Sequence, residues 1–192
     1  MSPAEATDRI KGHTLHLGAN LVGITRINPL WIYSHRGEIF HDNWMDWGTE
    51  IHNDHRYVVV FATEMSSRLI AASPHTPTNI ETQYQYARGA YISTLLAQFI
   101  ANLGYSASAN HLRHYELLMV PLAVDAGLGE LSRMGYLITK ALGPRVRLGA
   151  VYTDLPLIPD HPVDIGVEDF CKSAKNAAHA ALRIPFLPMS KR

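Results

Sequence analysis

The sequence predicts a single α+β domain, a sandwich in which helices and short strands alternate along the chain. A composition of 47% hydrophobic and 18% charged residues is that of a globular protein and not of a disordered one. Apolar side chains recur at helical spacing in residues 81–103 and alternate in Arg145–Thr153, as they do in a strand. The 192 residues contain no internal repeat, low-complexity tract or composition break, which favours one domain.

The first part of the chain predicts one helix and two strands. Residues 3–19 are expected to be helical, with Gly18 near the end of the helix. Runs of strand length, rich in β-branched or aromatic residues, occupy 21–27 and 57–63. The connection between these strands carries Trp31, Tyr33, Trp44 and Trp47. A connection of this length is uncommon unless it performs a function or packs as a lid.

The clearest helix spans residues 81–103 and is followed by Gly104, a residue type that commonly ends helices. Its periodic apolar residues are Ile92, Leu95, Leu96, Phe99, Ile100 and Leu103. The remaining expected elements are a strand at 105–109, a short helix at 120–126, a strand at 145–153 and a terminal helix at 167–182.

Charge and composition exclude several classes of function. Seventeen basic residues balance seventeen acidic ones, so no basic field favours nucleic acid or an anionic membrane. No apolar run approaches the roughly 20 residues of a membrane span. The first residues show neither an apolar signal region nor a twin-arginine pair, so we expect a cytoplasmic protein. The single cysteine cannot form an internal disulfide and is too few for a cysteine-ligated cluster or structural zinc site.

A block of about fifty residues, 120–170, contains the motifs AGLGELSR, GPRVR and TDLPLIPDHP. This block closely resembles the cobalamin-binding core of reductive dehalogenases, and a weaker resemblance extends towards the N-terminus. The resemblance implies the nitroreductase-like fold, a central, mostly antiparallel sheet flanked by helices. It also implies that 1–192 is one cobalamin-binding domain and that 167–192 is a remnant of the junction with an iron–sulfur domain.

In the resembling enzymes, ferredoxin-type cysteines follow this block. Bacterial ferredoxins ligate their clusters through the pattern C-x2-C-x2-C-x3-C-P. Here Cys171 occupies the first ligand position, Ala174, Ala177 and Ala181 occupy the other three, and Leu182 replaces the proline. We therefore expect no iron–sulfur cluster, and we expect turnover to need an external electron donor.

The resemblance also implies the catalytic residues. Counting from the FIANLGY motif places the family's proton-donating tyrosine at Tyr86, and the second arginine of GPRVR is Arg147. A phenol is a poor acid at neutral pH, and an adjacent guanidinium favours the phenolate, so Arg147 would make Tyr86 a better general acid. Taken alone, each residue is more often structural, and Tyr84 and Tyr91 are neighbours that compete with Tyr86.

A third polar residue accompanies this pair in the family. Counting back from Pro121 places it at His114. The connecting loop, SASANHLRHYE, is two residues longer than the family pattern, so His111 and Arg113 compete for the role.

The glycine-rich loop is expected to bind the cofactor, which the resemblance implies to be base-off cobalamin. Glycines let a backbone approach a flat macrocycle and offer N–H groups to its arms, whereas the structural alternative is a helix C-cap and turn. The candidate cofactor-binding residues are Gly127, Leu128, Gly129, Glu130, Leu131, Ser132, Arg133, Met134, Gly135, Tyr136 and Leu137.

Several functions remain in competition. The first is a reductive dehalogenase core, acting on a small organohalide and able to form a homodimer. The second is a cobalamin-binding module or engineered minimal scaffold without native turnover, since alanines stand at three ligand positions. A flavin nitroreductase relative is weaker, because no basic phosphate-binding patch lies near the N-terminus. A metal site at His41, Asp42, His52 and His55 lacks a recognised ligand spacing.

Overall fold

The centre of the molecule is a four-stranded antiparallel sheet with the order β1-β2-β6-β3. The structure is a computed structural model that describes residues 1–37, 48–112, 114 and 116–181, with side chains as far as residue 174. The strands are β1 (Leu21–Arg26), β2 (Tyr57–Glu64), β3 (Ala107–Asn110) and β6 (Val146–Thr153). A separate short hairpin pairs β4 (Glu130–Leu131) with β5 (Leu137–Ile138).

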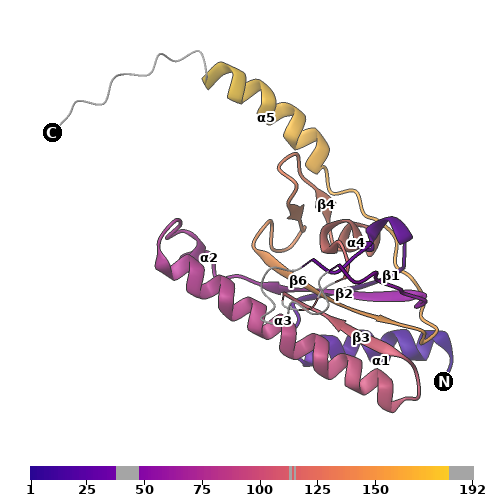
Figure 1. Cartoon of the computed structure of the whole chain (residues 1–192). Coiled ribbons are helices and arrows are strands. Elements are labelled where there is room, and N and C mark those ends of the chain that lie inside the picture. Colours follow the sequence, from indigo (N-terminus) through magenta and orange to yellow (C-terminus); the bar gives the residue numbers. More distant parts are fainter. Residues whose placement is uncertain (38–47, 113, 115, 182–192) are drawn as a thin grey trace.

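Helices cover both faces of this sheet, as Figure 1 shows. Helices α1 (Pro3–His16) and α3 (Thr76–Asn102) lie on one face, and α4 (Met119–Asp125) lies on the other. The shorter elements are η1 (Pro29–Trp31) and α2 (Ser67–Ile70), and α5 (Val167–Ala181) projects away from the sheet beyond the hairpin (Figure 1). The predicted α+β fold with an antiparallel sheet flanked by helices is confirmed.

The two central strands are buried on both faces. Val58 and Val60 of β2 face α4, whereas the intervening Val59 packs with the helices α1 and α3. β6 alternates in the same way, because Ala150 belongs to the α4 side and Val151 to the α1–α3 side. Side chains of a strand alternate between faces, so odd-numbered residues of β6 are directed towards α3. This places Arg147 on the α3 side of the sheet.

Two differences from the sequence-based expectation bear on the site. Helix α3 begins at Thr76, five residues before the expected start, and the residues it buries in its first half include Glu81 and Gln85. Hydrophobic periodicity cannot detect a buried face built from polar side chains. The glycine-rich loop contains the β4–β5 hairpin, whose two-residue strands are too short to show alternation.

A buried polar cluster fixes the aromatic segment that precedes β2 to the sheet. Glu116, 4% exposed, pairs with Arg36 and accepts a hydrogen bond from the Tyr152 hydroxyl at 2.5 Å. Asn110 Oδ1 also accepts from the Glu116 N–H at 2.8 Å. Burial, followed by the hydrogen bond to Glu116, raises the pKa of Tyr152 to about 12.

This raised pKa predicts a loss of stability at alkaline pH. The unfolded chain releases the tyrosine proton near its ordinary value of about 10, whereas folded Tyr152 retains it to about 12. The contribution of Tyr152 is therefore complete below about pH 10 and is lost as the pH rises to about 12. Between these pH values, the free energy of unfolding measured in urea should fall more steeply with pH for the wild type than for Tyr152→Phe. Equal slopes would contradict this assignment.

Candidate active site

A cavity of about 270 Å³ opens at the β6 end nearest the hairpin, where α3, the turn before α4 and the hairpin meet. Its lining is mainly apolar, with three side chains that carry polar groups, Tyr86, Tyr136 and Arg147. The lining residues are Tyr86, Leu112, Met119, Val120, Tyr136, Leu137, Pro144, Val146, Arg147 and Leu148. A mostly apolar cavity with few polar groups is typical of a small-molecule site.

The structure brings the two predicted catalytic residues together. The Cζ atom of Arg147 lies 5.2 Å from the centroid of the Tyr86 ring, within cation–π distance. Tyr86 comes from α3, and Arg147 lies near the start of β6 on the face directed towards that helix. Tyr84 and Tyr91, the competing tyrosines, are each 58% exposed and do not line the described cavity. The geometry therefore favours Tyr86 over its neighbours.

The guanidinium of Arg147 forms few hydrogen bonds with the described residues. Its Nη2 donates to Thr82 Oγ1 at 3.4 Å, a long hydrogen bond. Its Nε is buried and has no hydrogen-bond partner among the described residues. A buried donor without a partner costs free energy, so such a group is expected where a ligand completes the site.

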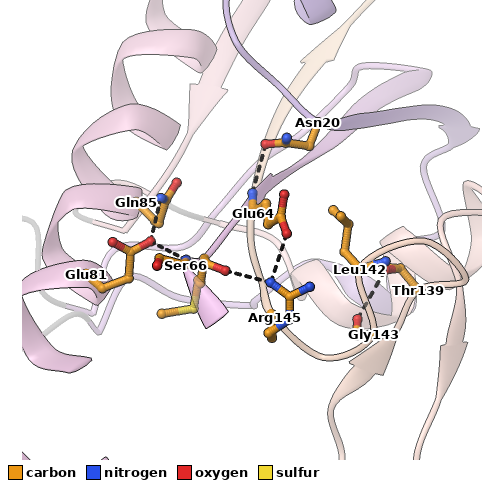
Figure 2. Close-up of polar contacts among 10 residues, drawn as sticks. Asn20, Glu64, Ser66, Glu81, Gln85, Thr139, Leu142, Gly143 and Arg145 are labelled. Carbon is orange, nitrogen blue, oxygen red and sulfur yellow. Dashed lines mark hydrogen bonds and ion pairs between the residues drawn. The ribbon is translucent and has the colours of Figure 1, made fainter. Parts of the chain in front are cut away.

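The other arginine of the GPRVR motif has a structural role, as Figure 2 shows. Arg145 Nη1 donates to Glu64 Oε1 at 2.8 Å and to the Met65 carbonyl at 3.0 Å. The Met65 N–H returns a hydrogen bond to the Arg145 carbonyl at 2.8 Å. These contacts join the end of β2 to the start of β6, so Arg145 fixes the strand that carries Arg147.

A second buried network holds the first half of α3 in place. Glu81, 5% exposed, accepts from the Ser66 N–H and from Gln85 Nε2, both at 2.8 Å (Figure 2). Arg88 extends the network by donating to Gln85 Oε1 at 2.9 Å and to the Gly18 carbonyl at 2.6 Å. These contacts fix the helix turns on which Tyr86 lies. Sequence reasoning missed them because their members are polar.

The predicted cofactor loop divides into two parts in the structure. Tyr136 and Leu137 line the cavity together with Tyr86 and Arg147. Large apolar side chains also lie exposed on the hairpin, with Leu131 56%, Met134 80% and Tyr136 58% accessible. Exposed apolar side chains grouped on one hairpin indicate a surface that binds a ligand or another protein.

The glycines at the base of the hairpin permit close packing within the protein itself. A Cβ atom at Gly129 would lie 2.1 Å from the Ile138 carbonyl oxygen, and one at Gly127 would lie 2.4 Å from that of His161. Gly127 also has φ +72°, which favours glycine. Glu130 Oε2 accepts from the N–H groups of Ile165 and Val167, at 2.7 and 3.0 Å, at the start of α5. These contacts fix the hairpin, whereas its tip and β5 face the cavity and solvent.

The third predicted polar residue, His114, is paired with one of its competitors, His111. His111 and His114 exchange backbone hydrogen bonds of 2.8 Å, and neither lines the described part of the cavity. Burial, with a smaller effect of His114, lowers the pKa of His111. Leu112, in the same turn, does line the cavity. The competing Arg113 lies outside the described residues.

The described residues contain no group of three or more side chains that could hold a metal ion. His55 instead contacts Asn53 and Ser106 at 2.9 and 2.8 Å, while His41 and Asp42 lie outside the described residues. Cys171 and Ala174 lie on α5, and the side chains of Ala177 and Ala181 are outside the described part. Within the described ranges, no helix is both long and apolar enough to cross a membrane.

Comparison with known proteins identifies relatives among the reductive dehalogenases. No family model matches the chain. The tetrachloroethene reductive dehalogenase of Sulfurospirillum multivorans is 33% identical over 92% of this chain and 39% of its own length. A solved reductive dehalogenase, described as suggesting a mechanism for B12-dependent dehalogenation, superposes with a TM-score of 0.81. It is 30% identical over 89% of this chain and 24% of its own.

A more distant solved structure supports the fold alone. Epoxyqueuosine reductase superposes with a TM-score of 0.58 at 16% identity, over 83% of this chain and 48% of its own. The chain spans about two fifths of the curated relatives' length. Sequence identity above 30% along nearly the whole chain, together with the same fold, shows that this chain is related to the reductive dehalogenases and corresponds to one part of them.

Proposed function

We propose that this chain is the cobalamin-binding catalytic core of a reductive dehalogenase, which replaces a carbon–halogen bond with a carbon–hydrogen bond. The observation that carries the proposal is the Tyr86–Arg147 pair at the cavity of a chain related to these enzymes. The substrate class is a small organohalide. The overall change breaks one carbon–halogen bond, consumes two electrons and one proton, and releases a halide ion.

The residues around the cavity fit a corrinoid. A cavity of about 270 Å³ is smaller than the cofactor, so it would take the substrate beside the reacting face of the corrin. The exposed Leu131, Met134 and Tyr136 offer an apolar surface for the macrocycle. Cobalamin, when bound base-off, supplies the low-potential reduction that breaks the carbon–halogen bond. The electrons would come from an external donor, and 167–192 would be the remnant of a junction with a cluster domain.

In this proposal Tyr86 Oη donates the proton that completes the new carbon–hydrogen bond. Arg147, whose Cζ lies 5.2 Å from the ring centroid, places its positive charge beside the phenol as that proton leaves. The apolar lining, which includes Leu112, Met119 and Leu148, limits water around the reacting carbon. His114, in the same turn as the cavity-lining Leu112, is our candidate for the third polar group.

The first test is binding of cobalamin to the purified chain. We expect the corrinoid to co-elute with the protein and its absorption spectrum to change to that of the base-off form. Met134→Glu, which puts a charge on the most exposed apolar side chain of the hairpin, should weaken binding about tenfold or more, because a charge resists burial against an apolar ring. Leu15→Glu is the matched control, because Leu15 is exposed on α1, across the sheet.

No retained corrinoid and no spectral change would overturn the proposal. Equal binding by Met134→Glu and the wild type would remove the hairpin from the cofactor site. Iron and acid-labile sulfide should be measured on the same preparation. We expect neither at cluster stoichiometry, because alanines stand at 174, 177 and 181. Several iron and sulfide atoms per chain would contradict that expectation.

One alternative is a corrinoid-binding module without turnover. The alanines that follow Cys171 at ligand spacing favour it, because no thiolate remains at those positions to deliver electrons through a cluster. The two functions separate under a strong artificial reductant. A catalytic core releases halide from an organohalide, whereas a module binds the corrinoid and releases none.

A further inference from the structure

The orientation of Arg147 depends on a second residue of α3. Thr82 and Tyr86 are four residues apart, so their side chains lie one above the other on the same face of the helix. Arg147 contacts both, because its Nη2 reaches Thr82 Oγ1 at 3.4 Å and its Cζ lies 5.2 Å from the Tyr86 ring. The guanidinium therefore spans one helical turn, from the threonine hydroxyl to the phenol ring.

The Thr82 hydroxyl is arranged to accept a hydrogen bond from this guanidinium. Its proton is donated to the Thr78 carbonyl at 2.9 Å, one turn earlier in the same helix. A hydroxyl has one proton and two lone pairs, so with its proton engaged it meets other groups as an acceptor. Arg147 carries donors and no acceptors, so the two groups are complementary.

The backbone of Arg147 is fixed independently of this contact. Arg147 lies opposite Thr63 in the β2–β6 ladder, and buried Thr63 Oγ1 donates to its carbonyl at 3.4 Å. The guanidinium, however, ends a long and flexible side chain. Among the described residues its one hydrogen-bond partner is Thr82, since the Nε has none. The strand pairing thus fixes the backbone position of Arg147, and the contact with Thr82 orients its guanidinium.

We propose that Thr82 is a positioning residue that holds the Arg147 guanidinium over Tyr86 and leaves its remaining donors free for a ligand. Thr82 is absent from the described cavity lining, so it acts through Arg147 and does not touch the substrate. Its effect on catalysis rests on the function proposed above. Its effect on Arg147 does not, and can be measured without cobalamin.

The first experiment observes the arginine directly by nitrogen-15 NMR of the cobalamin-free chain. The Arg147 side-chain signals are assigned by their loss in Arg147→Lys. In the wild type we expect separate signals for the two Nη groups, because a hydrogen-bonded guanidinium rotates slowly. Thr82→Val keeps the branched shape but lacks the acceptor, so its Nη signals should merge. Thr82→Ser retains the hydroxyl and should restore the separate signals.

Thr94→Val is the matched control, because Thr94 lies exposed on the same helix, away from Arg147. It should leave the arginine signals unchanged. An unchanged Arg147 spectrum in Thr82→Val would overturn the proposal, as would an equal change in Thr94→Val. A Thr82→Ser spectrum like that of Thr82→Val would do so too, since the hydroxyl would then be irrelevant.

The second experiment measures how the orientation of Arg147 affects the rate of dehalogenation. At equal corrinoid occupancy and with an artificial reductant, Thr82→Val should lower kcat about tenfold, equivalent to about 1.4 kcal/mol, with KM nearly unchanged. Thr82→Ser should recover most of that loss. A change in KM alone would contradict the positioning role. If the wild type releases no halide, the proposed function fails while the NMR result still decides the role of Thr82.

Discussion

Replacing Tyr86 with phenylalanine should lower the dehalogenation rate by about 10²–10⁴-fold, the usual contribution of general acid catalysis. The variant retains the ring beneath Arg147 and loses the proton, so cobalamin binding and folding should change little. The rate is measured as halide release with a strong reductant, at equal corrinoid occupancy.

Tyr84→Phe and Tyr91→Phe are matched controls for this experiment. Both tyrosines lie on α3 and are 58% exposed, outside the described cavity lining. They should retain the wild-type rate. Arg147→Lys should also be harmful, because an ammonium cannot replace the planar fork beside the phenol. A Tyr86→Phe rate within about threefold of the wild type, far below the range for general acids, would assign the proton to another donor.

Gly129→Ala should destabilise the protein and weaken its binding of cobalamin. The new Cβ would lie 2.1 Å from the Ile138 oxygen, 2.8 Å from its carbonyl carbon and 3.0 Å from the Thr139 Cα. All three are backbone atoms, so no side-chain rotation can relieve the overlap, and the β4–β5 hairpin must move. Overpacking of this kind typically costs about 1–3 kcal/mol. Displacing the hairpin should also weaken cobalamin binding by more than about tenfold, or about 1.4 kcal/mol.

Gly12→Ala is the control for this substitution. Gly12 lies within α1, and a Cβ atom added there would meet no other atom within 4 Å. Alanine at this position should therefore stabilise the helix by about 0.5–1 kcal/mol. Urea unfolding and cobalamin titration of both variants provide the comparison. Unfolding and binding of Gly129→Ala equal to those of the wild type would show that the hairpin tolerates displacement and does not form the cofactor site.

The sequence alone predicted the fold class and, through the family resemblance, the candidate pair Tyr86 and Arg147. The strand at 57–63 was recognisable from its run of β-branched and aromatic residues and the strand at 145–153 from its alternating apolar residues. Both lie at the centre of the sheet, where strands require apolar side chains. Tyr86 and Arg147 could be chosen through motifs shared with the family, although no local pattern distinguishes a catalytic tyrosine from Tyr84. The structure then placed the two side chains in contact.

Other features depended on the tertiary structure, because they join segments that are distant in sequence. The roles of Arg145 and Arg147 differ because strand pairing gives Arg145 the partner Glu64 and directs Arg147 towards α3. Gly129 is needed because Ile138 folds back against it, and Glu130 because α5 begins beside its carboxylate. The hydrophobic periodicity of a sequence indicates which side chains are buried. It does not indicate which polar groups form hydrogen bonds or ion pairs with one another, and in this protein those interactions position the candidate site.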